Sequence, residues 1–322
     1  MRQAAPVLAL SVALTTILAG LGPSFTLAVL RRDGLLIPFT SFDGRAWSTP
    51  WASSGSELPL GLDDVPRKWW GPLGPSTPWI AWMVADGTSR PLQIRRPAQV
   101  RVFCGARLGL VTDYKGEAVD EREPSVPKDA LAIAAAPGSV TLRPIINVSV
   151  RSPDAAKMTE VLREQFDSQE SLATRQFTAW RHPFGASARH ALPISLEAFY
   201  RFRETMPGKG EWLTSYVEAI RRFPASPDDQ GCGLITWVRG WVFEQAGQKP
   251  DVHVKAIVTY CDREDVSFMQ PFGHLTLDGE NYWIYQMSSW RDELYTVAHV
   301  QPDEVHPVVV VDGGGCPKGH VK

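Results

Sequence analysis

Short apolar runs separated by turn residues dominate the chain from residue 25 to about residue 150. Three of these runs lead into an Asp-Gly dipeptide, at Asp33, Asp43 and Asp86. Asp-Gly between apolar runs is a strong signal for a β-hairpin, because glycine tolerates the positive φ of a tight turn. Further runs have the composition of strands: 99–104, 108–113, 131–135 and 140–148. The pattern predicts a β-meander domain over residues 23–150.

The hydrophobic period changes to that of a helix after Ser152. Ser152 precedes Pro153, which is the arrangement of an N-cap hydroxyl followed by a proline at the first helical position. Apolar residues then recur at helical spacing as far as Phe166, with charged residues on the other side. We expect one amphipathic helix from Asp154 to Glu170, within a helix and linker segment of residues 151–192, that packs its apolar stripe on a sheet.

From Pro193 onward the period is two, as in strands with one buried face. Residues 194–202 alternate between apolar and polar, and a Pro-Gly turn joins them to the run 212–223. This arrangement predicts a hairpin, with a helix over 194–202 as the alternative. Six more runs have the composition of strands: 234–243, 252–261, 268–277, 281–290, 294–300 and 305–311. Their regular spacing predicts an antiparallel, sandwich-like domain over 193–316, followed by a tail at 317–322.

The predicted fold class is therefore all-β, with two antiparallel β-meander or sandwich-like domains joined by one amphipathic helix. The start of the chain also indicates the compartment in which the protein works. Arg2 precedes an apolar run from residue 4 to about residue 20, which a Gly-Pro pair ends. We expect residues 1–22 to be a cleaved signal peptide and the mature protein to be secreted or periplasmic. A retained membrane anchor is the alternative, because apolar character resumes at residues 25–30.

Composition and motifs exclude several function classes. The chain has 322 residues, 44% of them hydrophobic, and a formal net charge of -2 without charge blocks. It is long enough to bury a large core, and it lacks the clustered basic face of a nucleic-acid-binding protein. The Gly-x-Ser-x-Gly motif of serine hydrolases and the close ligand spacings of zinc sites do not occur. We expect no metal and no cofactor; His182 and His190 are the only loosely clustered histidines.

The cysteines fit an oxidising compartment. The chain has four of them: Cys104, Cys232, Cys261 and Cys316. A hairpin around Gly247 would bring Cys232 and Cys261 to its open end, and Cys316 follows three glycines near the C-terminus. We expect Cys232 to pair with Cys316 or else with Cys261, while Cys104 pairs or stays a buried thiol. A nucleophilic Cys261 beside charged neighbours is the functional alternative.

Aromatic density is the compositional feature that indicates binding, since the chain has 12 Trp. In one predicted strand, period two places Trp237, Arg239 and Trp241 on one face. The functional interpretation is a platform for a sugar ring or for the side chains of a partner, and the structural interpretation is core packing. Trp69 and Trp70, in a Pro-rich loop, are either an exposed contact patch or plugs that close one end of the first domain.

These observations favour an exported, non-catalytic binding or structural protein of the cell envelope or extracellular space. Its partner would be an envelope protein or a carbohydrate, with no nucleic acid and with membrane contact only through a retained leader. The alternative is an extracytoplasmic carbohydrate-active hydrolase, whose two carboxylates would come from distant strands and leave no local motif. A third hypothesis, a cell-surface assembly subunit, predicts a long unpaired edge strand. The sequence does not decide whether the protein is an enzyme.

Overall fold

The computed structural model describes residues 22–51, 61–102, 105–118, 126–136, 138–176, 182–206, 210–225, 233–301 and 303–315. The described residues are 54% strand and 13% helix, which confirms the predicted all-β class. The strands are antiparallel and form three sheets, with one long helix between two sheet regions. The predicted leader at residues 1–22, apart from Gly22, lies outside the described residues, as does the tail at 317–322.

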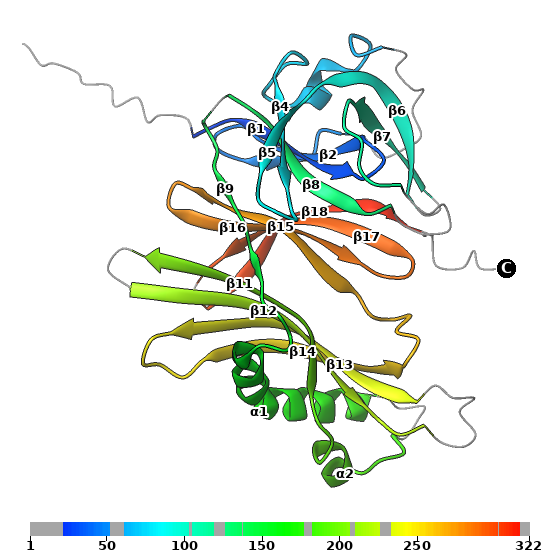
Figure 1. The fold of residues 1–322 in the computed structure, drawn as a ribbon, viewed down its shortest axis with the longest axis vertical. Helices are drawn as coiled ribbons and strands as arrows, with labels where there is room; N and C mark the ends of the chain where they lie inside the picture. Colours follow the sequence, from blue (N-terminus) through cyan, green and yellow to red (C-terminus); the bar gives the residue numbers. More distant parts are fainter. Residues whose placement is uncertain are drawn as a thin grey trace, which may run out of the picture.

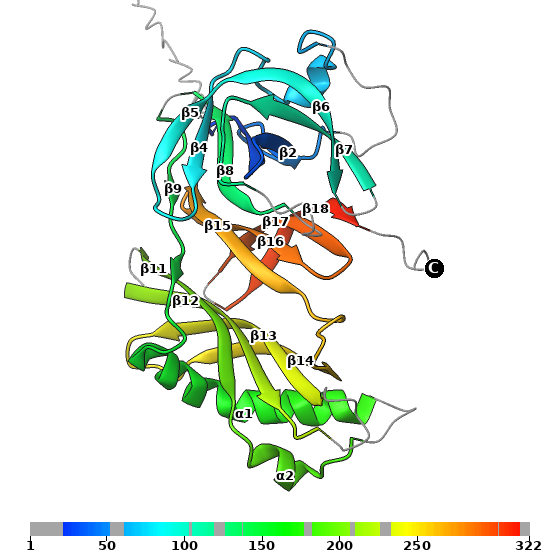
Figure 2. The same cartoon turned by 45° about the vertical axis from the view of Figure 1, so that its right-hand side comes forward.

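Sheet A is a small barrel formed by the first third of the chain (Figures 1 and 2). Its strands are β1 (Phe25–Arg31), β2 (Leu35–Phe42), β3 (Trp47–Ser48), β4 (Trp79–Met83), β5 (Ser89–Leu92), β6 (Ile94–Val102), β7 (Gly105–Thr112) and β8 (Lys128–Ala135). The strand order is β5-β4-β8-β1-β2-β7-β6, with β3 paired to β2. The strands at the two ends of this order, β5 and β6, are separated only by Gln93. They therefore form one bent segment, which closes the sheet into a barrel. The strand β8 lies between β1 and β4, so the order differs from that of a simple meander.

Sheets B and C together form the predicted sandwich. Their strands are β9 (Leu142–Arg143), β10 (Ile146–Asn147), β11 (Ser195–Met206), β12 (Gly210–Arg222), β13 (Leu234–Gln245), β14 (Asp251–Tyr260), β15 (Phe268–Leu277), β16 (Glu280–Ser288), β17 (Asp292–Val300) and β18 (Val305–Gly315). Sheet B has the order β18-β17-β16-β15-β9, and sheet C has the order β10-β11-β12-β13-β14. The single strand predicted at 140–148 is wrong: the chain makes two short strands there because it passes from sheet B to sheet C.

A tight turn shows how local sequence sets the register of sheet B. Asp278 and Gly279 form a two-residue loop between β15 and β16, where Leu277 pairs with Glu280. Both loop residues have positive φ, 51° for Asp278 and 83° for Gly279. This is the geometry of a type I′ turn, which matches the twist of the two strands that it joins. The Asp278-Gly279 pair therefore closes a hairpin between β15 and β16.

The layers are stacked in the order barrel, sheet B, sheet C and helix α1 (Pro153–Gln176) (Figure 1). One hydrophobic core lies between the barrel and sheet B, a second between sheets B and C, and a third between sheet C and α1. A buried ion pair also joins the barrel to sheet B, because Lys128 Nζ lies 2.5 Å from Glu293 Oε2. The division into domains at residues 150 and 193 stays a prediction.

The predicted amphipathic helix is confirmed, and it is longer than expected. Ser152 Oγ accepts a hydrogen bond from the backbone N–H of Ala155 at 3.1 Å, as an N-cap does. The apolar stripe that includes Leu162 and Phe166 packs against sheet C. The helix continues beyond Glu170 to Gln176. Apolar periodicity does not reveal this part, where Glu170 is buried in a polar cluster. Within the described part of the chain, no helix is long and apolar enough to cross a membrane.

Candidate functional site

The register of three neighbouring strands aligns nine side chains on the face of sheet C that is turned toward sheet B. We call these residues the grid: Tyr216, Glu218 and Ile220 on β12, Trp241, Arg239 and Trp237 on β13, and His253, Lys255 and Ile257 on β14. Tyr216 and Trp241 pack in the core between sheets B and C. Residues of the alternate parity, such as Val217 and Val238, face α1 instead. The face that period two assigned to Trp237, Arg239 and Trp241 is therefore confirmed.

Burial falls steadily across the grid from β12 to β14. The three residues on β12 are buried, with Glu218 only 2% exposed. Arg239 and Trp241 are half-buried, whereas His253 and Lys255 are exposed. Sheet B thus covers the β12 side of the grid and leaves the β14 side open to solvent. A ligand that approaches from β14 would meet charged groups first and aromatic rings next.

Trp241 is held in place by other rings and keeps part of its surface accessible. Its ring centroid lies 5.1 Å from that of Tyr216 and 4.9 Å from that of Trp283, both in edge-on geometry. Tyr285 lies farther away, at 6.2 Å. Edge-to-face contacts of this kind fix the orientation of a ring. Trp241 therefore offers a rigid, half-exposed aromatic surface.

Trp237 lies deeper and packs as a core residue. It is 1% exposed, and Phe268 meets its ring edge-on at 5.0 Å. The Arg263 guanidinium lies 5.4 Å from the ring centroid. The structural interpretation, core packing, therefore fits Trp237, while Arg239 and Trp241 keep the exposure that a binding platform needs.

Glu218, Arg239 and Lys255 form one row across the grid, since Glu218 pairs with Arg239 and Arg239 pairs with Lys255. Burial raises the pKa of Glu218 to about 7, while a backbone N–H and the Arg239 charge act in the opposite direction. That N–H belongs to Met269, which donates to Glu218 Oε1 at 2.6 Å. Arg239 Nη1 donates to the backbone oxygen of Ser267 at 3.2 Å. The row therefore holds two cations and one carboxyl that titrates near neutral pH.

Buried polar atoms without partners gather in the same layer. Among the described residues, Tyr216 Oη and Trp237 Nε1 in the grid have no hydrogen-bond partner, and neither has Trp212 Nε1 nearby. His274, stacked on Phe202, makes no hydrogen bond of ordinary geometry through either ring nitrogen. Burial lowers the pKa of His274 to about 3, so the ring stays neutral. Unpaired groups of this kind in a protein interior call for water or for the hydroxyl groups of a ligand.

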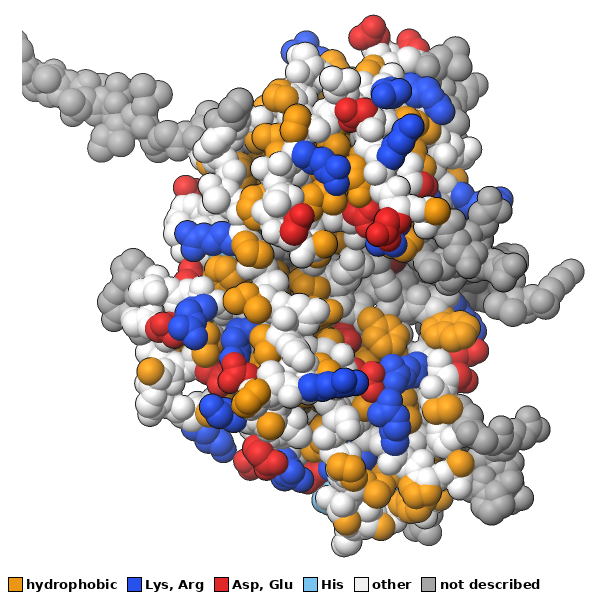
Figure 3. All heavy atoms as spheres, in the orientation of Figure 1, with side chains coloured by type: hydrophobic (Ala, Val, Ile, Leu, Met, Phe, Trp, Pro, Cys, Tyr) orange, Lys and Arg blue, Asp and Glu red, His pale blue; other side chains and the backbone are white. Residues whose placement is uncertain are grey.

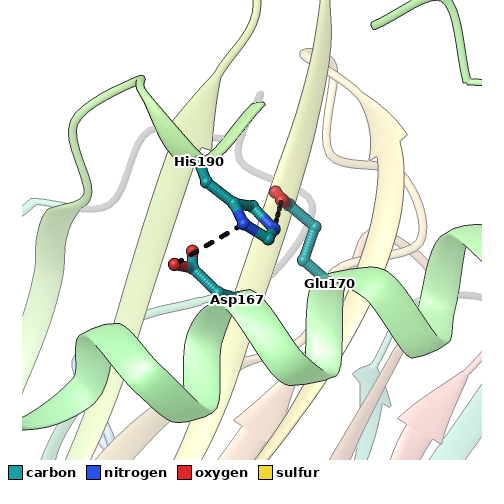
Figure 4. Close-up of side chains that lie close together, drawn as sticks. All are labelled: Asp167, Glu170 and His190. Atoms are coloured by element: carbon teal, nitrogen blue, oxygen red, sulfur yellow. Dashed lines mark ion pairs between the residues drawn. The ribbon is translucent and has the colours of Figure 1, made fainter. Parts of the chain in front are cut away.

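A second polar cluster joins α1 to sheet C and to the short helix α2 (Ala186–His190) (Figure 4). The ring nitrogens of His190 lie 3.9 Å from Asp167 Oδ2 and 3.7 Å from Glu170 Oε2. These three side chains are of the types that bind metals. However, Arg221 already pairs with Asp167 at 2.7 Å and with Glu170 at 2.8 Å, and Thr236 donates to Glu170 at 2.7 Å. The cluster is a buried salt-bridge anchor, because its carboxylates are already neutralised.

Two cavities lie on the barrel. One, of about 170 Å³, is lined by apolar side chains such as Ile80 and Trp82. The other, of about 630 Å³, is lined by Arg32, Tyr114 and Asp129 among others. In the larger cavity Asp129 is already paired, with Arg32 Nε at 3.0 Å and with the Tyr114 hydroxyl at 2.6 Å. The grid differs from both cavities, because it combines aromatic rings with Arg239 and Lys255, which form no ion pair with a described carboxylate, and with buried polar atoms that have no partner in the described part of the chain.

Trp69 and Trp70 lie away from the grid, in a 3₁₀ turn, η1 (Arg67–Trp70), beside the barrel. Their exposed fractions are 8% and 4%. The Trp70 ring meets Trp51 edge-on at 5.3 Å, and Thr26 Oγ1, near the start of β1, donates to the Trp70 backbone oxygen at 3.4 Å. Their burial fits the plug interpretation and leaves little surface for the contact-patch interpretation.

Cys261 ends the strand pairing of β13 with β14 and is not a free thiol. Its backbone N–H donates to the oxygen of Gly233 at 3.0 Å. A nucleophilic thiolate at Cys261 therefore finds no support. Cys104, Cys232 and Cys316 lie outside the described residues.

Periodicity within one strand revealed Arg239 and Trp241 but missed Glu218 and Lys255. Those two residues join the site only through the register of β12 and β14 with β13, which is a long-range property. Comparison with known proteins finds no match: no protein-family model, no curated protein and no solved structure is significantly similar to this chain.

Proposed function

We propose that this chain is an exported, non-catalytic binding protein and that its ligand contacts the grid on sheet C. One observation carries the proposal: half-exposed Trp241 and Arg239 lie on the same face of β13, in a layer where Tyr216 Oη and Trp237 Nε1 have no partner among the described residues. A rigid ring with a few polar groups that converge on it is the usual composition of a small-ligand site. The same arrangement suits a sugar ring or the side chains of an envelope protein.

Export is supported by the leader-like start of the chain and by the state of Cys261. We propose that Cys261 forms a disulfide with Cys232, one of the two pairings expected from the sequence. Leu234 pairs with Tyr260, and the Cys261 N–H donates to Gly233, the residue that follows Cys232. Structural disulfides persist in oxidising compartments such as the periplasm and the extracellular space.

A glycan array and a pull-down from envelope extract test the binding function directly. We expect the wild-type protein to retain a specific glycan or envelope protein, and the Trp241→Ala variant to lose it. Trp290→Ala is the matched control, because Trp290 is 59% exposed and lies outside the grid. Circular dichroism and thermal unfolding of both variants separate loss of binding from loss of fold. Equal retention by the wild-type and Trp241→Ala proteins would refute a site on the grid.

One observation favours the hydrolase alternative. A carboxyl whose pKa lies near 7, as at Glu218, stays protonated long enough to act as a general acid. A glycosidase also needs a second carboxylate at a defined separation. If the alternative holds, the protein releases reducing ends from a retained glycan and Glu218→Gln abolishes that release. A retained glycan that stays intact would leave only the binding function.

A further inference from the structure

The row Glu218, Arg239 and Lys255 carries an unusual charge arrangement. Arg239 and Lys255 lie directly opposite each other on adjacent antiparallel strands. Like charges in this position destabilise a sheet. Among the described residues, neither side chain takes part in an ion pair with a carboxylate. The fold therefore places two cations side by side at the open side of the grid, and among the described residues neither forms an ion pair within 4.0 Å of a carboxylate.

Two cations close to the grid are paired with carboxylates. Arg263 lies 3.3 Å from Glu197, and His253 lies 2.8 Å from Asp251. On the face shown in Figure 3, Lys and Arg side chains are interspersed with Asp and Glu. Arg239 and Lys255 make no such pair among the described residues, and the half-exposed ring of Trp241 lies on the same face, two residues from Arg239 on β13.

We propose that the grid binds an acidic saccharide, with a carboxylate or phosphate group of the sugar held between Arg239 and Lys255 and a sugar ring against Trp241. The proposal rests on the binding function proposed above and names its ligand class. Hydrogen bonds from a guanidinium and an ammonium to an oxyanion are charge-assisted and stronger than neutral ones.

The same row makes the anion affinity depend on pH. The charged groups around Glu218 are Arg239 on β13, Glu197 on β11 and Arg263 in the loop before β15. When Glu218 is ionised it offsets part of the Arg239 charge, and when it is protonated the row is more positive. Affinity for an acidic saccharide should therefore rise as the pH falls through about 7. In Glu218→Gln this rise should shrink, because glutamine does not titrate.

Calorimetric titration with acidic trisaccharides and their neutral methyl esters tests the ligand class. The panel holds trigalacturonate, trimannuronate and a trisaccharide phosphate, each compared with its ester so that only the charge changes. We expect at least one acid to bind more tightly than its ester, with an affinity that falls as salt rises. Lys255→Gln should weaken that binding by about tenfold. Lys249→Gln, an exposed lysine outside the grid, should leave it unchanged.

The outcomes separate the ligand class from the binding function. Esters that bind as tightly as their acids would overturn the acidic ligand while the binding function stands. Equal affinity in Lys255→Gln and Lys249→Gln would also overturn it, because the anion would then lie elsewhere. If the glycan array and the pull-down find no ligand either, the proposed function fails as well. Comparison of the carboxylate and phosphate arms identifies which anion the pair prefers.

Discussion

Replacing Glu218 by glutamine removes one ionisable group from the buried β12 side of the grid and keeps the shape of the side chain. Glutamine still presents an oxygen to the Met269 N–H, which lies 2.6 Å from Glu218 Oε1. The wild-type carboxyl is 2% exposed, and burial moves its pKa from the ordinary value of 4.5 to about 7. Comparison of the variant with the wild type therefore measures how much a negative charge at this position lowers the free energy of unfolding.

The size and sign of the effect follow from proton linkage. Between the two pKa values the folded protein holds the proton of Glu218 more tightly than the unfolded chain does. Its contribution to stability is therefore fully present below about pH 4.5 and is lost as the pH rises through about 7. The loss amounts to about 3 kcal/mol. Glutamine does not titrate, so Glu218→Gln should gain about 3 kcal/mol relative to the wild type between pH 4.5 and pH 8.5.

Urea unfolding at a series of pH values, followed by tryptophan fluorescence under non-reducing conditions, measures this difference. Glu211→Gln is the matched control, because Glu211 lies on the same strand at the surface and pairs with Arg203 at 3.3 Å. The control should follow the wild type at every pH. A constant difference between Glu218→Gln and the wild type over the whole range would refute the reasoning about burial of Glu218.

Three further predictions concern the framework around the grid. Glu170→Ala removes the fully buried carboxylate that pairs with Arg221 and should lower the free energy of unfolding by about 3 to 5 kcal/mol, whereas the exposed Glu164→Ala should change it little. Equal effects of the two variants would contradict the anchor role. Gly240→Ala places a methyl group against a backbone oxygen of β14 and should cost about 2 kcal/mol in urea unfolding, so an unchanged midpoint would argue against the close approach of the strands. Peptide mapping without reduction should recover Cys261 linked to Cys232, and recovery of a different pair would replace that assignment.

Local sequence signals predicted most of the strands. The Asp-Gly pairs marked real hairpins, and the alternation after Pro193 gave β11 to β14 as a meander. The closure of the barrel was not predictable in the same way. It depends on the insertion of β8 between β1 and β4, which brings together segments about 50 to 100 residues apart. Such pairings follow from packing of the whole sheet, and no turn signal encodes them.

The candidate site was predictable only in part for the same reason. Period two along one strand put Arg239 and Trp241 on a common face, which the structure confirms. The residues opposite them, Glu218 and Lys255, depend on the register of two hairpins. A shift by one residue would send both to the other face, toward α1. The charge row therefore could be recognised only once the register was known.

Side-chain NMR is the most direct test of the claim that the grid is the ligand site. During titration with the acidic trisaccharide that binds most tightly, the Arg239 guanidinium and Trp241 indole resonances should shift together with one dissociation constant. Resonances of the barrel, such as the Trp79 indole in its core, should stay in place. Shifts confined to the barrel, with Arg239 and Trp241 unmoved, would contradict the account.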